Sequence, residues 1–234
     1  MPDTNNIPIV VIACKVFQHL LETHLPPESR VKSITFLDYG LHQVPRNLTT
    51  AVQELIDEVH EPSLVVLGYG LCGNGLHGIK SGKNTLLIPR TDDCIAILLG
   101  SYHDYQREFW GNPATYYLTK GWLESGSNPL EEHDEYEKRY GSETAAYLMD
   151  QQYQHYKRLA LVAHNEDDMA AYRAKAEDIA RYCERWGMRY EEILGSDTYV
   201  RQLIEVAFAI ESAGDEFLVV PPGGELQQNQ FLRR

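Results

Sequence analysis

Short apolar runs rich in valine, isoleucine and leucine recur along the chain, and each ends in a turn. Because these runs are continuous and do not alternate with polar residues, they are typical of strands covered on both faces, as in a parallel sheet. Between several of them, apolar residues spaced three and four apart predict helices. We expect strands at residues 9–13, 34–37, 64–67, 85–88, 159–163 and 216–220, and helices at 16–23, 48–60, 168–186 and 198–210. The predicted fold class is α/β, with two Rossmann-like lobes whose mainly parallel sheets are flanked by helices.

The stretch 124–157 is more polar than its surroundings and has no long apolar face. Its acidic, basic and tyrosine residues alternate at helical spacing, which predicts one long or two short helices with a solvated face. The sequence therefore favours three parts: an amino-terminal α/β lobe at 1–123 that carries three cysteines, a helical connection at 124–157, and a carboxy-terminal α/β lobe at 158–234.

The charge of the chain narrows the classes of partner. With 34 acidic residues against 21 lysines and arginines, the formal net charge is −13, which argues against a general nucleic-acid binder. The amino terminus has no basic region, and its apolar run at 7–13 is too short for a secretory signal or a membrane span. We therefore expect a cytoplasmic protein with no membrane partner. Its four cysteines should then be reduced, and act as core residues, nucleophiles or metal ligands.

Three of the cysteines follow apolar runs. Cys14 comes after IPIVVIA, Cys72 lies in the turn GYGLCGNG after LVVL, and Cys94 lies in PRTDDC after LLI. Ligands of parallel α/β sheets bind outside the carboxyl ends of the strands, so we expect the three thiols to converge there. Three thiolate ligands with a vacant fourth position suit a catalytic metal site, either a [4Fe-4S] cluster, which we favour, or zinc. Cys183 lies on a predicted helix and is interpreted as a packing residue.

Two other interpretations of these cysteines stay open. In the first, the cysteines are small residues that pack beside strand ends. In the second, Cys72 alone is a nucleophile that the surrounding glycine amides activate. The same glycines fit a G-x-G-x-x-G frame, but no acidic residue follows at the spacing that dinucleotide binding requires. P-loop, H-E-x-x-H and G-x-S-x-G motifs do not occur in the sequence.

Further polar residues are candidates for a small-molecule site. Arg90 is suited to hold a carboxylate or phosphate, and Asp93 or His103 to move a proton. Asn74 and the aromatic Tyr117 are candidates to contact the substrate, which we expect to be small and anionic. The simpler alternatives are a salt bridge for Arg90 and a helix cap for Asp93.

Five segments carry a resemblance to a known family: ACKVF, LGYGLCGNG, IPRTDDCIAILLGS, TYYLTKGW and FLVVPPGG. Together they resemble the archaeal and bacterial family catalogued as domain of unknown function 1638. The resemblance implies that Cys14, Cys72 and Cys94 are the shared thiols and that Cys183 is not. It also implies a corrinoid or methyltransferase partner, because the family's members resemble neighbours of corrinoid-dependent methyl-transfer systems. The chain lacks the D-x-H-x-x-G signature of a cobalamin carrier, so its role there would be that of a helper.

By analogy, the layout of the thiols is similar to that of quinolinate synthase, in which three cysteines from separate α/β units hold a [4Fe-4S] cluster with one open iron. We therefore expect a metal- or iron–sulfur-dependent lyase or transferase of small-molecule metabolism, with a homo-oligomer as a further expectation. The alternatives are a non-catalytic metal or cofactor carrier that assists a corrinoid methyltransferase system, and a metal-free enzyme with a cysteine nucleophile.

Overall fold

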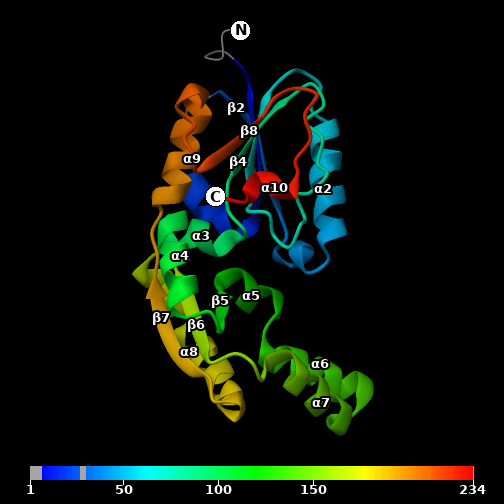
Figure 1. Cartoon of the computed structure of the whole chain (residues 1–234), viewed down its shortest axis with the longest axis vertical. Helices are drawn as coiled ribbons and strands as arrows, with labels where there is room; N and C mark the ends of the chain where they lie inside the picture. Colours follow the sequence, from blue (N-terminus) through cyan, green and yellow to red (C-terminus); the bar gives the residue numbers. More distant parts are fainter. Residues whose placement is uncertain (1–6, 27–29, 234) are drawn as a thin grey trace. The chain divides into compact units, whose positions relative to one another are not determined.

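Two β-sheets flanked by helices form the fold, which confirms the predicted α/β class. The computed structural model describes residues 7–26 and 30–233. It divides the chain into two compact units (Figure 1). The first unit contains the chain up to Tyr102 together with the segment from Asp197 onward, and the second contains His103–Ser196.

The first unit is built on a five-stranded sheet of order β2-β1-β3-β4-β8. Strands β1 to β4 are parallel, and β8 is antiparallel to β4. β1 lies between β2 and β3, so the strand order reverses at β1, and such a switch point is where open α/β sheets bind ligands. The strands are β1 (Ile9–Cys14), β2 (Val31–Leu37), β3 (Leu64–Gly68), β4 (Thr85–Pro89) and β8 (Phe217–Val220).

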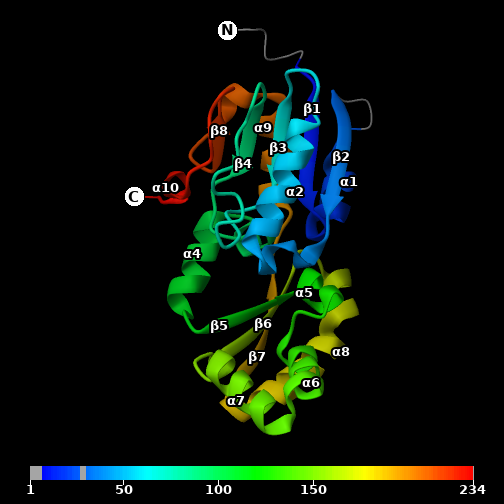
Figure 2. The same cartoon turned by 90° about the vertical axis from the view of Figure 1, so that its right-hand side faces the viewer.

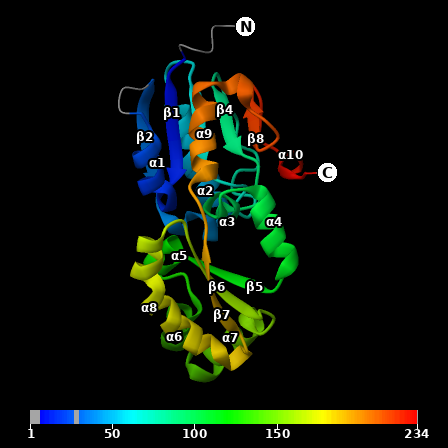
Figure 3. The same cartoon turned by 90° about the vertical axis from the view of Figure 1, so that its left-hand side faces the viewer.

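Helices cover both faces of this sheet, which explains the continuous apolar runs of β1, β3 and β4. Helix α2 lies on one face (Figure 2), and α1 and α9 lie on the other (Figure 3). α2 buries Leu48, Val52 and Ile56, which recur every four residues along one side of the helix. The helices of this unit are η2 (Lys15–Phe17), α1 (Gln18–His24), η3 (Tyr39–Gln43), α2 (Pro45–Asp57), α3 (Cys94–Leu99), α9 (Thr198–Phe208), η5 (Ile210–Ser212) and α10 (Gln228–Phe231), and α4 (Tyr102–Gly111) begins at its boundary.

The second unit is built on a three-stranded parallel sheet of order β5-β6-β7. Its core joins α8 to β6, and the rings of Tyr116, Tyr153 and Tyr156 pack together beside them. The strands are β5 (Thr115–Thr119), β6 (Arg158–Ala163) and β7 (Arg189–Leu194). The helices are α5 (Lys120–Ser125), α6 (Pro129–Tyr140), α7 (Ser142–Tyr153), α8 (Glu166–Cys183) and η4 (Glu184–Trp186).

The division into units differs from the one expected at 1–123, 124–157 and 158–234. Residues 197–234 return to the first unit because β8 pairs with β4 and buries Phe217 and Val220 there. The polar stretch 124–157 forms two helices, α6 and α7, inside the second unit. No helix within the described ranges is long and apolar enough to span a membrane.

Candidate functional site

The three predicted site cysteines lie at the carboxyl edge of the first sheet. Cys14 is the last residue of β1, Cys72 lies in the loop after β3, and Cys94 is the first residue of α3, after β4. Because β1, β3 and β4 are parallel neighbours, their ends open on one side of the sheet. The thiols therefore flank the switch point beside β1.

Two glycines let the cysteine-bearing segments approach one another. A Cβ atom at Gly68 would lie 2.5 Å from the Cβ of Ala13, next to Cys14. A Cβ atom at Gly70 would lie 2.8–2.9 Å from the backbone of Asp93, next to Cys94. Both distances are too short for any side chain, so glycine is required where the backbones meet.

Backbone hydrogen bonds join the Cys72 loop to the segment that precedes Cys94. The amide of Leu71 donates to the carbonyl oxygen of Thr91, and the amide of Cys72 donates to that of Asp92, both at 2.9 Å. Cys72 has a φ of 48°, in the left-handed region that non-glycine residues rarely adopt. Such strain persists where the surrounding structure enforces it, and it is common at functional sites.

The three thiols affect one another's pKa values. Burial raises the pKa of Cys14 to about 11, and it raises the pKa values of Cys72 and Cys94 further. The negative charge of one thiolate opposes another: Cys14 raises the pKa of Cys72, and both raise that of Cys94. Hydrogen bonds from the amides of Gly70 and Cys94 lower the pKa of Cys72, but less than burial raises it. The thiols of the metal-free protein are therefore protonated at neutral pH.

The thiol cluster, defined as Cys14, Cys72 and Cys94, does not have metal-ligating geometry in this structure. Within residues 7–26 and 30–233, no group of three or more histidine, cysteine, aspartate or glutamate side chains is arranged to hold a metal ion. Each cysteine residue of the cluster is partly exposed, but the burial of its thiol group raises the pKa. Cys183 is buried in the core of the second unit, in line with a packing role.

Asp93 lies directly beside the thiol cluster. It is the N-cap of α3, and its Oδ1 accepts a hydrogen bond from the amide of Ile95 at 2.8 Å. Burial raises its pKa to about 6, and its charge raises the pKa values of Cys72 and Cys94. Asp93 thus forms the cap that the sequence suggested, and it is also a carboxyl group that titrates near neutral pH.

Arg90 is held by the carboxy-terminal segment of the chain. Its Nε donates to the carbonyl oxygen of Gln230 and its Nη2 to that of Leu232, both at 2.7 Å, and Nη1 lies 2.8 Å from Asp215. These contacts occupy both edges of the guanidinium group. The salt bridge considered for Arg90 is therefore present, with Asp215 as the carboxylate.

The other predicted site residues lie on other elements of the two units. Asn74 is exposed in the Cys72 loop, with a φ of 73°. His103 and Tyr117 belong to the second unit, where His103 is exposed on α4 and Tyr117 is half-buried in β5.

Two residues beside the thiol cluster were not identified from the sequence. Tyr69 directly follows β3 and is only 3% exposed. Burial raises the pKa of Tyr69, and Cys14, Cys72 and Asp38 raise it further. Asp38 directly follows β2 and also raises the pKa of Cys14. Both directly follow strands, as Cys72 and Cys94 follow strands at a greater distance, so a search of all polar residues after the predicted strands would have found them.

Comparison with known proteins yields one finding. No curated protein and no solved structure matches the chain. The family model described as protein of unknown function (DUF1638) matches residues 36–204, which is more than two thirds of the chain. The matched part includes Cys72 and Cys94 and begins after Cys14. The chain therefore belongs to the DUF1638 family, as its motifs indicated.

Proposed function

We propose that Cys14, Cys72 and Cys94 together bind a [4Fe-4S] cluster or a metal ion with one open coordination position, in an enzyme of small-molecule metabolism. The observation that supports the proposal is that β1, β3 and β4 are parallel neighbours, so the three cysteines follow strands that end at one edge of the sheet.

The charges around the thiol cluster favour a cation. Asp38 acts on Cys14, and Asp93 acts on Cys72 and Cys94, so deprotonation adds negative charge beside two carboxylates. A metal ion or cluster would offset this repulsion, and its binding would release the thiol protons. Three thiolates are suited to zinc or iron, and a fourth position is left for water or substrate.

Of the two kinds of metal centre, a [4Fe-4S] cluster and a single metal ion, we favour the cluster. The backbone groups of Gly70 and Cys94 lower the pKa of Cys72, and backbone amides near sulfur tune the potentials of iron–sulfur clusters. An open iron would act as a Lewis acid toward a small substrate. Such a centre requires reduced thiols, so the proposal includes a cytoplasmic location.

The alternatives have less support. A metal-free nucleophile needs a lowered thiol pKa, whereas burial raises all three. A non-catalytic carrier for a corrinoid methyltransferase system would use the same thiols, and its support is the family resemblance alone.

Anaerobic purification followed by iron, zinc and acid-labile sulfide analysis tests the proposal. We expect about one centre per chain, with iron and sulfide in equal amounts if it is a cluster. Cys14→Ser, Cys72→Ser and Cys94→Ser should each lower the metal content sharply, because each removes one of three protein ligands. Cys183→Ser is the matched control and should keep the metal content of the parent protein. Equal metal content in all four variants, or no metal in the parent protein after reconstitution, would refute the proposal.

A further inference from the structure

Strand β2 forms one edge of the five-stranded sheet in the first unit. It comes first in the order β2-β1-β3-β4-β8, and among the described residues it pairs with β1 alone (Figures 2 and 3). The outer side of such a strand presents backbone N–H and C=O groups that no neighbouring strand pairs with. An edge of this kind is a template for pairing with another chain, unless its sequence blocks the pairing.

The two edge strands of this sheet differ in how their sequences protect them. β8, at the opposite edge, has four residues and is followed by Pro221 and Pro222, which have no N–H group to donate. β2 has seven residues without proline or glycine, and Lys32 is its single charged residue. Edge strands that stay unpaired are usually short, charged or interrupted by proline, so the sequence of β2 is that of a strand open to pairing.

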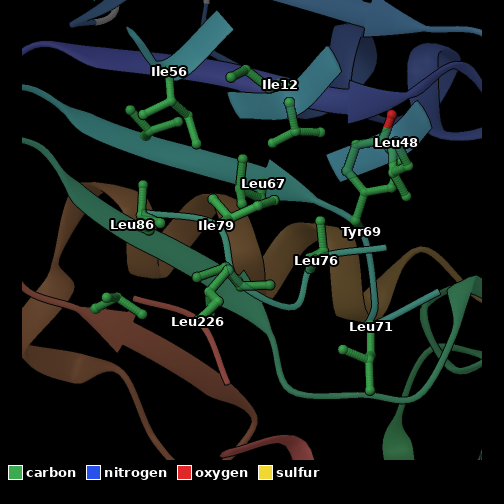
Figure 4. Close-up of a cluster of buried hydrophobic side chains, with 14 of the residues drawn as sticks. Ile12, Leu48, Ile56, Leu67, Tyr69, Leu71, Leu76, Ile79, Leu86 and Leu226 are labelled. Carbon is green, nitrogen blue, oxygen red and sulfur yellow. The ribbon is translucent and has the colours of Figure 1, made fainter. Parts of the chain in front are cut away.

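The side chains of β2 are accessible on both faces of the sheet. The hydrophobic core lies over β1, β3 and β4 (Figure 4), and β2 contributes no buried residue to it. Ile34 is 37% exposed. One groove on the surface is lined by Ser33 and Thr35 together with residues of α2, and a second groove is lined by Ile34 together with residues of α1. The helices therefore leave room for a second chain beside β2.

The sequence of β2 is complementary to itself in the antiparallel direction. If two copies pair about a twofold axis at Thr35, the two Thr35 residues lie opposite each other, and Ile34 lies opposite Phe36 of the partner subunit. Pairs of threonines, and pairs of an aromatic with a β-branched residue, stabilise antiparallel strands when they lie directly opposite each other. The twofold axis produces the Ile34–Phe36 pair twice.

Lys32 and Asp38 add charge complementarity at the two ends of this pairing. They flank Ser33–Leu37, the part of β2 in regular register with β1. Both are exposed, and neither forms an ion pair with another described residue. In the same antiparallel register, Lys32 lies opposite Asp38 of the partner subunit, and pairs of opposite charge are the third kind that stabilises such strands.

The net charge of the chain makes these pairs important. Each copy carries a formal net charge of −13, so two copies repel each other over most of their surfaces. β2 itself contains no acidic residue, and the pairing places a lysine against each Asp38 that follows it. The edge at β2 is therefore suited to a second copy of this chain.

We propose that the protein forms a homodimer in which the β2 strands of two copies pair antiparallel about a twofold axis at Thr35. The two five-stranded sheets then join into one continuous sheet. Ile34 packs against Phe36 of the partner subunit, and Lys32 forms an ion pair with Asp38 of the partner subunit. The dimer does not depend on the proposed metal site, because no cysteine of the thiol cluster lies on β2.

Charge reversal tests both the interface and its register. Sedimentation equilibrium of the full chain should give a dimer with twice the 26.7 kDa mass of one chain. Lys32→Asp and Asp38→Lys should each weaken dimerisation by about tenfold or more, because each replaces two pairs of opposite charge with two pairs of like charge. The double variant Lys32→Asp/Asp38→Lys restores opposite charges and should dimerise as the parent protein does.

Lys80→Asp is the matched control. Lys80 is also an exposed lysine of the first unit, but it pairs through its backbone with Glu225, which follows β8 at the other edge of the sheet. Its reversal changes the net charge by the same amount as Lys32→Asp. We expect Lys80→Asp to dimerise nearly as strongly as the parent protein.

Each outcome decides for or against the proposed dimer. A parent protein that is monomeric up to about 1 mM overturns it. Equal weakening by Lys32→Asp and Lys80→Asp would show that another surface forms the dimer, and a folded double variant that stays monomeric would show that the register is wrong. If circular dichroism finds a variant unfolded, hydrogen exchange of the parent protein decides. The amides of β2 should exchange more slowly as the protein concentration rises, and exchange that is independent of concentration overturns the proposal.

Discussion

Arg233 donates hydrogen bonds to the backbone carbonyl oxygen of Arg90, just after the end of β4. The Nη2 of Arg90 donates to the carbonyl oxygen of Leu232 at 2.7 Å, and the Nη2 of Arg233 donates to the carbonyl oxygen of Arg90 at 2.8 Å. Arg233 also forms an ion pair with Glu216, with an N–O distance of 2.6 Å. The two arginines thus fasten the carboxy-terminal segment to the sheet that carries the thiol cluster.

Arg90→Lys tests whether this arginine serves the fold or a ligand. Lysine keeps the charge but cannot reproduce the hydrogen bonds to Gln230 and Leu232 together. We expect the free energy of unfolding, measured by urea denaturation, to fall by about 1–3 kcal/mol. Arg107→Lys is the control, because Arg107 is exposed and pairs with Asp104 three residues earlier on α4; it should change stability by less than about 0.5 kcal/mol. Unchanged stability would favour the ligand role instead.

The sequence contains a local signal for the position of the cysteines at the strand ends, but none for the division into units. Cys14 and Cys94 could be placed because each follows a continuous apolar run, and the carboxyl ends of parallel strands share one edge. The return of β8 to β4 could not be predicted, because this antiparallel pairing joins residues far apart in sequence and leaves no local pattern. The runs of β8 and β6 look alike in sequence, although they belong to different sheets.

Two strands of the second unit were missed for a related reason. β5 contains two tyrosines and two threonines, and β7 contains three charged residues and no buried residue. Neither is the continuous apolar run by which the other strands were recognised. Both are held by Arg158, whose Nε donates to Thr115 at 2.8 Å and whose Nη1 pairs with Glu191 at 2.9 Å. The spacing of apolar residues along the chain does not reveal a buried arginine that bridges two strands.

Gly70→Ala tests the close approach of the Cys72 and Cys94 segments. The added methyl group would lie within 2.9 Å of Asp93 backbone atoms, so the two segments must move apart. We expect the free energy of unfolding to fall by about 1–3 kcal/mol, together with a loss of metal binding. Gly214→Ala is the control in the same unit, because nothing lies within 4 Å of its added Cβ. Normal metal binding by Gly70→Ala would show that the spacing of the segments does not control the site.

The raised thiol pKa values predict slow alkylation of the metal-free protein. With a pKa of about 11, Cys14 is a thiolate in only about one molecule in a thousand at pH 8, against roughly a quarter for an ordinary cysteine. We expect iodoacetamide to modify it roughly a hundredfold more slowly in the folded protein than in urea, measured site by site with mass spectrometry. Modification of Cys72 faster than in urea would instead support the metal-free nucleophile.

The raised pKa of Asp93 predicts that the stability of the metal-free protein depends on pH. Its pKa is about 6 in the folded protein and about 3.9 in an unfolded chain, so between these values the folded state binds more protons. Stability must therefore fall as the pH rises from about 4 to 6, by up to about 3 kcal/mol from this group.

Asp93→Asn separates this charge from the capping role. Asparagine is as good an N-cap as aspartate, so the variant keeps the hydrogen bond to Ile95 while it loses the buried charge. We expect Asp93→Asn to equal the parent near pH 4 and to be more stable at pH 8 in urea denaturation of the metal-free protein. Asp93→Ala removes the cap as well, and should be less stable than Asp93→Asn by about 1 kcal/mol at both pH values. If Asp93→Asn is less stable than the parent at pH 8, the ionised carboxylate has a stabilising partner and the raised pKa is wrong.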